Sequence, residues 1–274
     1  MSASEALQQD DFQFLQKLIY EKTGIVIGDH KKEMIYRRIS RRMRDLNIDI
    51  IEDYCSILRA NDSDEMNNFI NAVTTNLTSF FRENHHFEFV KTEFKKMFTQ
   101  SRKKRLRVWS SACSTGEEPY SIAITLKEAF GKDIDRLDAK ILATDLDTQV
   151  IQTAKNGVYD QGRVKDLAPD LISKWFSAPN SQNQYSIDNR LKQLITFNKL
   201  NLLGPWPIKG KFDVIFCRNV LIYFDKPTQE TLVKRFYDTL EDNGILMLGH
   251  SESVLKGNDN FVNLGKTIYQ KKVH

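Results

Sequence analysis

The feature that most constrains the fold is a change in hydrophobic patterning near residue 106 of the 274-residue chain. From Leu106 onward, short apolar stretches typical of strands alternate with amphipathic stretches typical of helices. Such alternation predicts a mostly parallel, doubly wound α/β sheet. Before that point the apolar residues show helical spacing only, so a small all-helical domain is expected to precede the sheet.

The chain divides into parts that differ in composition. The helical domain is expected over 1–73, and a polar linker that contributes to a site is expected over 74–90. The α/β domain is expected over 91–274. Segment 158–195 interrupts the alternation with two prolines and the polar run NSQNQ, so it is expected to form an inserted subdomain or an elaborate loop.

The composition excludes several classes of protein. With 41% hydrophobic and 28% charged residues, the chain is not wholly disordered. No uncharged run reaches the roughly 18 apolar residues of a spanning helix. The N-terminal sequence shows no secretory signal, and the three cysteines form neither a disulfide framework nor a CxxC site. A cytoplasmic protein without direct membrane insertion is therefore expected.

A basic amphipathic helix is predicted over 31–46. Its apolar side chains share one face, and the opposite face is cationic. That face carries Arg37, Arg41 and Arg44, with Arg38 at its flank. From the residues alone, it is either a solvated surface or a binding surface for nucleic acid or a carboxylate-rich protein. No aromatic residues interleave with the arginines, which disfavours stacking on single-stranded nucleic acid.

In an open α/β sheet, ligands bind at the carboxyl ends of the strands. The first predicted strand leads into SSACSTGEEPYS, residues 110–121, whose small residues let a ligand approach the backbone. This loop lacks the GxGxxG pattern, and Glu117 and Glu118 suit an ammonium group better than a pyrophosphate. The loop therefore disfavours a dinucleotide and indicates S-adenosylmethionine, although the two acids also suit the helix dipole alone.

Polar residues end two further strands. Asp145 is a candidate for binding ribose hydroxyls, or alternatively for capping the next helix, a role that Asp147 also fits. Arg218 and Asn219, followed by Tyr223, come after a later apolar strand and are either site residues or turn and surface residues. No nucleophile elbow, Walker loop or HExxH motif is present, which disfavours covalent hydrolysis, ATP chemistry and zinc proteolysis.

The polar linker also has two interpretations. Asn76, Thr78 and Arg82 either line a site at the domain junction or belong to a connector that caps the next helix. His85 and His86 are adjacent, so on a helix their side chains should point about 100° apart. Such divergent rings should not bind one ion together, and no metal is expected.

The motifs TTNLTSFFREN, SSACSTGEEPYSIAI, ATDLD, FCRNVLIYFD and GHSES occur in that order. Together they resemble the chemotaxis-receptor methyltransferases, the CheR family, and the resemblance covers essentially the whole chain. It implies a Rossmann-like class I methyltransferase sheet with a helical N-terminal domain and an inserted β-subdomain at about 158–195. It also implies S-adenosylmethionine-dependent methylation of glutamate side chains on bacterial chemoreceptors. The products would be glutamate methyl esters and S-adenosylhomocysteine.

The resemblance also implies a role for individual residues. Tyr223 would lie near the transferring methyl group and, with Arg218, would orient the reactants. The basic helix would face the acidic methylation region of the receptor, with Arg37, Arg38, Arg41 and Arg44 binding the substrate. The residues implied to contact the cofactor are Asn76, Thr78, Arg82, Glu117, Asp145, Asn201, Leu202, Arg218 and Asn219.

A glutamate is already ionised near neutral pH, so the implied reaction needs no general base. The expected partner is the cytoplasmic domain of a chemoreceptor, without nucleic acid, and a monomer is expected. Two alternatives stay open: an S-adenosylmethionine enzyme acting on RNA or another protein, and a binding module without catalysis. Whether 158–195 docks a peptide from the receptor C-terminus is also open.

Overall fold

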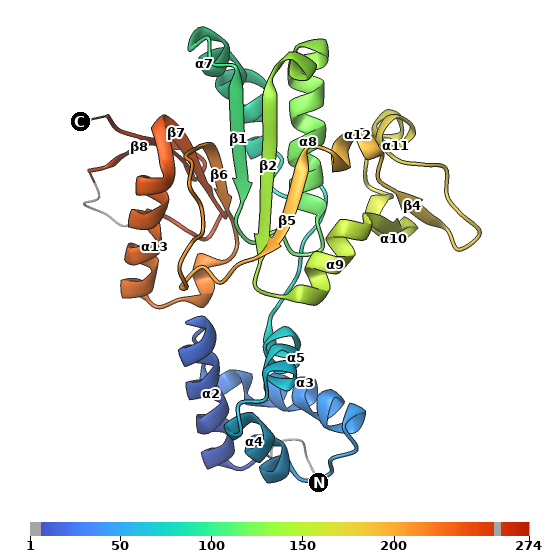
Figure 1. Ribbon diagram of the computed structural model, residues 1–274, viewed down its shortest axis with the longest axis vertical. Coiled ribbons are helices and arrows are strands. Elements are labelled where there is room, and N and C mark those ends of the chain that lie inside the picture. The colour runs from blue at the N-terminus through green and yellow to red at the C-terminus, as the bar shows by residue number, and fades with distance from the viewer. Residues whose placement is uncertain (1–6, 255–258, 274) are drawn as a thin grey trace.

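The computed structural model describes residues 7–254 and 259–273. A small helical domain and a larger α/β domain lie one below the other, joined by a linker (Figure 1). The helical domain comprises α2 (Gln9–Thr23), the 3₁₀ turn η1 (Asp29–Lys31), α3 (Lys32–Asp45), α4 (Ile51–Arg59) and α5 (Ser63–Val73).

The helical domain has a hydrophobic core of its own, to which each of its α-helices contributes. Ile35, Ile39 and Met43 form the buried side of α3, as the amphipathic pattern predicts. This packing turns the opposite, arginine-rich side of α3 outward.

The α/β domain is built on a sheet with the strand order β5-β2-β1-β6-β7-β9-β8 in the part of the chain that the structure describes. The neighbours from β5 to β7 pair in parallel, whereas β9 pairs antiparallel with both β7 and β8. The strands are β1 (Arg105–Ser110), β2 (Asp138–Asp145), β5 (Ile195–Lys199), β6 (Phe212–Cys217), β7 (Leu240–Leu248), β8 (Phe261–Gly265) and β9 (Ile268–Lys271).

Helices cover both faces of this sheet, and α8 and α13 lie on opposite sides of the strands (Figure 1). Val108 of β1 belongs to the same core as Ile122 of α8, whereas the next residue, Trp109, packs with Phe236 of α13. This alternation confirms the predicted doubly wound α/β fold. The helical segments of this domain are α6 (His85–Phe89), the π-helical turn η2 (Val90–Phe94), α7 (Lys95–Gln100), α8 (Glu117–Phe130), η3 (Gly131–Arg136), α9 (Thr148–Asn156), η4 (Leu221–Tyr223) and α13 (Lys226–Thr239).

The segment between α9 and β5 forms a separate lobe at the side of the sheet (Figure 1). Strand β3 pairs antiparallel with β4, and Trp175 and Leu191 of the lobe join the core beneath α8. The lobe comprises β3 (Val158–Asp160), α10 (Gln161–Val164), α11 (Pro169–Trp175), β4 (Gln184–Ser186) and α12 (Asn189–Lys192).

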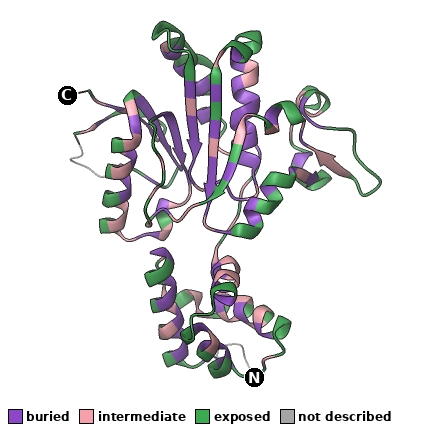
Figure 2. Cartoon of the chain, in the orientation of Figure 1, coloured by how far each residue is buried: buried purple, intermediate pink, exposed green. Residues whose placement is uncertain are grey.

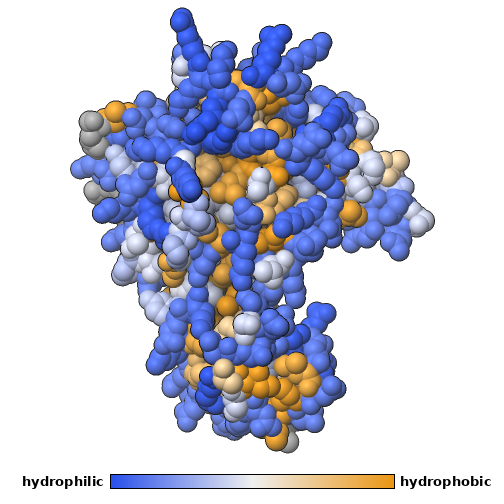
Figure 3. All heavy atoms as spheres, in the orientation of Figure 1, coloured by the Kyte–Doolittle hydropathy of each residue, from blue (hydrophilic) through white to orange (hydrophobic). Residues whose placement is uncertain are grey.

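Buried residues concentrate in the strands and on the inner sides of the helices, while the outer helix faces are exposed (Figure 2). On the face shown in Figure 3, hydrophobic atoms gather over the central strands and at the base of the helical domain, and the rest is largely hydrophilic. Within the described ranges, none of the helices has the length and apolar character needed to cross a membrane.

Candidate active site

A pocket opens between the two domains at the carboxyl ends of the central strands. It encloses about 1160 Å³, counting the space at its mouth. Strand β1 lies next to β6, and the chain continues from β1 to β2 on one side and from β6 to β7 on the other. This is the switch point of a doubly wound sheet, where proteins of this architecture bind ligands.

Most of the predicted site residues line this pocket, although they come from distant segments. The helical domain adds Lys31 and Met34 to the wall, and the strand-end loops add Ser111 and Ala112. The predicted residues on the wall are Asn76, Thr78, Arg82, Asp145, Asn201, Leu202, Arg218, Asn219 and Tyr223.

Asp145 ends β2 with its carboxylate held by the backbone. Its Oδ2 accepts a hydrogen bond from the Ser114 N–H at 2.8 Å, and its Oδ1 accepts one from the Asp147 N–H at 3.0 Å. Burial raises the pKa of Asp145 to about 6, although these backbone bonds oppose the rise. The group is therefore an ionisable acceptor fixed on the pocket wall.

The cap of the next helix is Asp147, so the alternative role considered for Asp145 does not apply. The Asp147 Oδ1 accepts hydrogen bonds from the N–H groups of Gln149 and Val150 in the first turn of α9. Its Oδ2 accepts from the Asn76 amide at 2.8 Å. The cap thus ties the linker to the end of β2.

The two acids that open α8 point in different directions, which bears on the predicted cofactor contact of Glu117. The Glu117 side chain is fully buried and does not line the pocket. Its oxygens accept hydrogen bonds from Arg163 at 2.8 Å and from the Thr115 hydroxyl at 2.6 Å. Glu118 lines the pocket instead, because consecutive helical residues point about 100° apart.

Arg218 is buried in a network of acids at the pocket wall. Its guanidinium lies 3.1 Å from Glu118 and 3.5 Å from Glu83, and it donates to the carbonyl of Arg82. Burial raises the pKa of Glu118, and the charge of Arg218 opposes that rise. Burial alone would also raise the pKa of Glu83, but a hydrogen bond from His250 and the charge of Arg218 lower it to about 2.

The loop after β6 is held by acids that the sequence reasoning missed. The Glu252 carboxylate accepts hydrogen bonds from the N–H groups of Asn219 at 2.9 Å and Gly249 at 2.6 Å. Glu83 accepts from the Asn219 side chain at 3.3 Å. Both acids fall within the quoted motifs FFREN and GHSES, so their positions were visible in the sequence but their roles were not.

Tyr223 lies where the helical domain meets the pocket. Its carbonyl accepts a hydrogen bond from the Val26 N–H at 2.8 Å, and the Lys31 ammonium lies 5.9 Å from the centre of its ring. Asn201 makes a second connection to the helical domain through the carbonyl of Lys22, at 2.9 Å. A cationic group from the basic helix segment therefore faces the predicted catalytic tyrosine.

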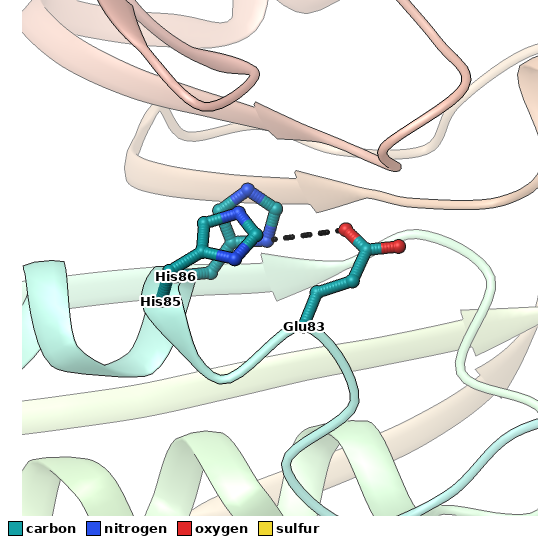
Figure 4. A group of neighbouring side chains, drawn as sticks. All are labelled: Glu83, His85 and His86. Carbon is teal, nitrogen blue, oxygen red and sulfur yellow. Dashed lines mark ion pairs between the residues drawn. The ribbon is translucent and has the colours of Figure 1, made fainter.

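The expectation that His85 and His86 diverge is wrong. Their ring centres lie 4.1 Å apart, because the Nε2 atoms of both rings turn to the carbonyl of Lys266. Together with Glu83 they place possible metal-ligand atoms within 4.8 Å of one another (Figure 4). Arg218 lies 3.5 Å from Glu83, and both histidines contact the carbonyl of Lys266, whereas the Glu83 Oε2 and the His86 Nδ1 are buried without a hydrogen bond. The expectation that no metal binds here stays a prediction.

The arginines of α3 do not all project freely. The Arg38 guanidinium donates to the carbonyls of Val73 and Thr74, each at 2.7 Å, and so closes the end of α5. Arg37 pairs with Glu33 on the same helix. Arg41 and Arg44 are exposed, and their side chains make no hydrogen bond or ion pair within the described residues.

A doubly wound sheet with a pocket of charged and polar residues at its switch point is typical of α/β proteins that bind a ligand there. Comparison with known proteins narrows the class. The family model for "CheR methyltransferase, SAM binding domain" matches residues 76–270, and that for "CheR methyltransferase, all-alpha domain" matches 10–74.

Curated relatives are similar over nearly the whole chain. A "Chemotaxis protein methyltransferase" of Salmonella typhimurium is 42% identical, over 98% of this chain and 92% of the relative. A "Chemotaxis protein methyltransferase" of Escherichia coli is 39% identical, over 98% of this chain and 93% of the relative. A "Probable chemotaxis protein methyltransferase" of Rhizobium etli is 40% identical, over 92% and 96%.

The chain belongs to the CheR methyltransferase family. It is an enzyme that uses S-adenosylmethionine to methylate a substrate in chemotaxis, as the resemblance predicts. The donor set of the pocket fits that cofactor, since Glu118 and Asp145 suit its ammonium and ribose groups and Arg82 suits its carboxylate.

Proposed function

We propose that this enzyme methylates glutamate side chains on the cytoplasmic domains of chemoreceptors and acts in the cytoplasm as a monomer. The observation that carries the proposal is the position of Tyr223. It lines the cofactor pocket beside Lys31, on the side where the basic helix α3 begins. An acidic substrate would therefore meet positive charge as it approaches the pocket.

The cofactor roles are assigned to the residues on the pocket wall. Glu118 replaces Glu117 as the acid for the ammonium group, Arg82 takes the carboxylate, and Asp145 takes the ribose hydroxyls. When bound, S-adenosylmethionine supplies a methyl group on a positively charged sulfur that serves as leaving group. The remaining contacts are assigned to Asn76, Thr78, Asn201, Leu202 and Asn219.

The protein's contribution to the chemistry is alignment. The substrate carboxylate is ionised at neutral pH, so the site does not need to remove a proton. Orienting the reacting groups and excluding water supplies about 7–11 kcal/mol in favourable cases. Tyr223 orients the carboxylate. The buried Arg218 fixes Glu118 directly and, through Glu83, the loop that carries Asn219.

The receptor-binding surface is assigned to the outer face of α3. Arg41 and Arg44 offer exposed charge without an ion-pair partner among the described residues, while Arg37 shares its charge with Glu33. Arg38 serves this surface indirectly, because it holds the start of the linker in place. A surface of this kind increases the rate of association with an acidic partner and does so less at high salt.

The test is transfer of labelled methyl groups from S-adenosylmethionine to membranes that contain the organism's chemoreceptors. Base-labile label released as methanol supports a carboxyl methyl ester. The control is membranes without receptors. Absence of transfer, together with calorimetric binding of S-adenosylhomocysteine, would contradict the receptor substrate, and salt-dependent binding of RNA would then favour the nucleic-acid alternative.

A further inference from the structure

A charged side chain of the inserted lobe reaches the linker and the start of α8, close to the cofactor pocket. Arg163 belongs to α10, and its Nη1 donates to the Glu117 carboxylate at 2.8 Å and to the carbonyl of Thr78 at 3.2 Å. Thr78 lies on the pocket wall, and Glu117 directly precedes the pocket acid Glu118. One guanidinium nitrogen thus connects the lobe, the linker and the start of α8.

The partner of Arg163 has no exposure to water. The Glu117 side chain is fully buried, whereas the Arg163 side chain is 47% exposed. A buried carboxylate needs a charged partner, and removing that partner costs more than an exposed ion pair contributes. The interaction is therefore suited to hold the first turn of α8 in one orientation.

The surrounding contacts reinforce the same junction. The Tyr159 hydroxyl of the lobe donates to the carbonyl of Thr115 at 2.8 Å, just before α8. Gly116 adopts φ 101°, and a Cβ there would lie 2.8 Å from that hydroxyl oxygen. The Phe80 ring of the linker packs edge-on against Tyr159, with ring centres 5.0 Å apart. The lobe thus contacts both segments that carry cofactor residues.

We propose that Arg163 is a positioning residue for S-adenosylmethionine, which it serves by fixing Thr78 and, through Glu117, the orientation of Glu118. The proposal deepens the assignment of the pocket made above and rests on it. Arg163 does not touch the pocket itself. Its loss should therefore weaken cofactor binding while leaving the alignment at Tyr223 intact.

The experiment compares Arg163→Ala with a matched control, Arg190→Ala. Arg190 pairs with Asp188 at 2.8 Å within the same lobe, and its hydrogen bonds among the described residues go to Asp188 and to the carbonyl of Lys174. Calorimetry with S-adenosylhomocysteine gives Kd, and methyl transfer to receptor membranes gives kcat and the KM for S-adenosylmethionine. Thermal unfolding of each variant reports stability separately.

For Arg163→Ala we expect Kd and KM to rise about tenfold, as for the loss of a charge-assisted hydrogen bond, with kcat within about threefold of the wild type. Arg190→Ala should leave all of these values within about twofold. Arg163→Lys keeps the charge but not the guanidinium geometry, so it should fall between the wild type and the alanine variant.

A double-mutant cycle with Glu117→Gln tests whether Arg163 and Glu117 act together or independently on the binding of S-adenosylhomocysteine. Because Arg163→Ala already removes the pairing with Glu117, the double variant should bind S-adenosylhomocysteine about as tightly as Arg163→Ala alone. If Arg163→Ala fails to fold, the lysine variant and Glu117→Gln carry the test. A Kd equal to that of the wild type, even with a lower Tm, would overturn the proposal. Failure of the wild type itself to bind S-adenosylhomocysteine would instead contradict the assignment of the pocket.

Discussion

Acidification should weaken cofactor binding through Asp145, because the carboxylate assigned to the ribose hydroxyls titrates close to neutral pH. Burial raises the pKa of Asp145 to about 6, from an ordinary value of 3.8. At about pH 5 roughly nine-tenths of these groups are protonated. We therefore expect the affinity for S-adenosylhomocysteine to fall about tenfold per pH unit below about pH 6 from this group alone.

The same pKa fixes the sign of the effect on stability. The folded protein holds this proton more tightly than the unfolded chain, so the free energy of unfolding falls as the pH rises from about 4 to about 6. The difference between 3.8 and about 6 corresponds to about 3 kcal/mol. Asp145→Asn removes the free-energy cost of keeping a buried carboxyl group ionised. However, the single side-chain oxygen of asparagine accepts only one of the hydrogen bonds from Ser114 and Asp147.

These opposing changes leave the stability of Asp145→Asn close to that of the wild type at neutral pH, while its affinity should fall at least about tenfold. Calorimetry with S-adenosylhomocysteine across pH tests both expectations. Burial also raises the pKa of Glu118, so the variant keeps that part of the pH dependence and loses only the part due to Asp145. The matched control is Asp213→Asn, a buried acid at the opposite end of the sheet that pairs with Lys103.

The control variant Asp213→Asn should lower the free energy of unfolding without weakening the binding of S-adenosylhomocysteine. The reasoning would be refuted if wild-type affinity stayed constant down to about pH 5, or if Asp145→Asn bound the product as tightly as the wild type.

The remaining predictions concern the reacting end, the receptor surface, the loop after β6 and the question of a metal. Tyr223→Phe should lower kcat at least about tenfold and leave Kd for S-adenosylhomocysteine within about twofold, as kinetics beside calorimetry would show. Replacing Arg41 and Arg44 by alanine should lower kcat/KM for the receptor and flatten its salt dependence. Gly249→Ala should lower the free energy of unfolding by about 1–3 kcal/mol in a urea titration, because its Cβ would lie 2.5 Å from the Asn219 amide nitrogen. Activity should withstand EDTA, and a loss reversed by a divalent ion would contradict the expectation that the residues in Figure 4 bind no metal.

The sheet could be predicted because each strand and helix shows its hydrophobic pattern within its own short stretch of sequence. Strand β6 is buried along its entire length, and the helices on both faces of the sheet show hydrophobic periodicity. Together these patterns predict a doubly wound sheet. The edge strand β8 is different, since only Phe261 of its residues is buried and its pattern hardly differs from that of a loop. Local patterning therefore identifies the centre of the sheet better than its edge.

The site shows the same limit at the level of single residues. Glu117 and Glu118 are adjacent and chemically alike, and Glu117 is engaged by Arg163, 46 positions further along the chain. Arg38 belongs by spacing to the cationic side of α3, yet its partners are carbonyls 35 and 36 positions away. Helical periodicity gives the direction of a side chain but not the distant partner that engages it.

The chemistry explains why the set of motifs in its order along the chain predicts this function better than one motif alone. Methyl transfer to an ionised carboxylate needs no proton acceptor, and no histidine is found among the described residues that line the pocket. Burial lowers the pKa of the nearby His86 to about 3, and its ring is fixed on the carbonyl of Lys266. The enzyme therefore depends on groups that bind and align, and these stand singly at the ends of separate strands. Their relation becomes visible only when the strand order brings the segments together.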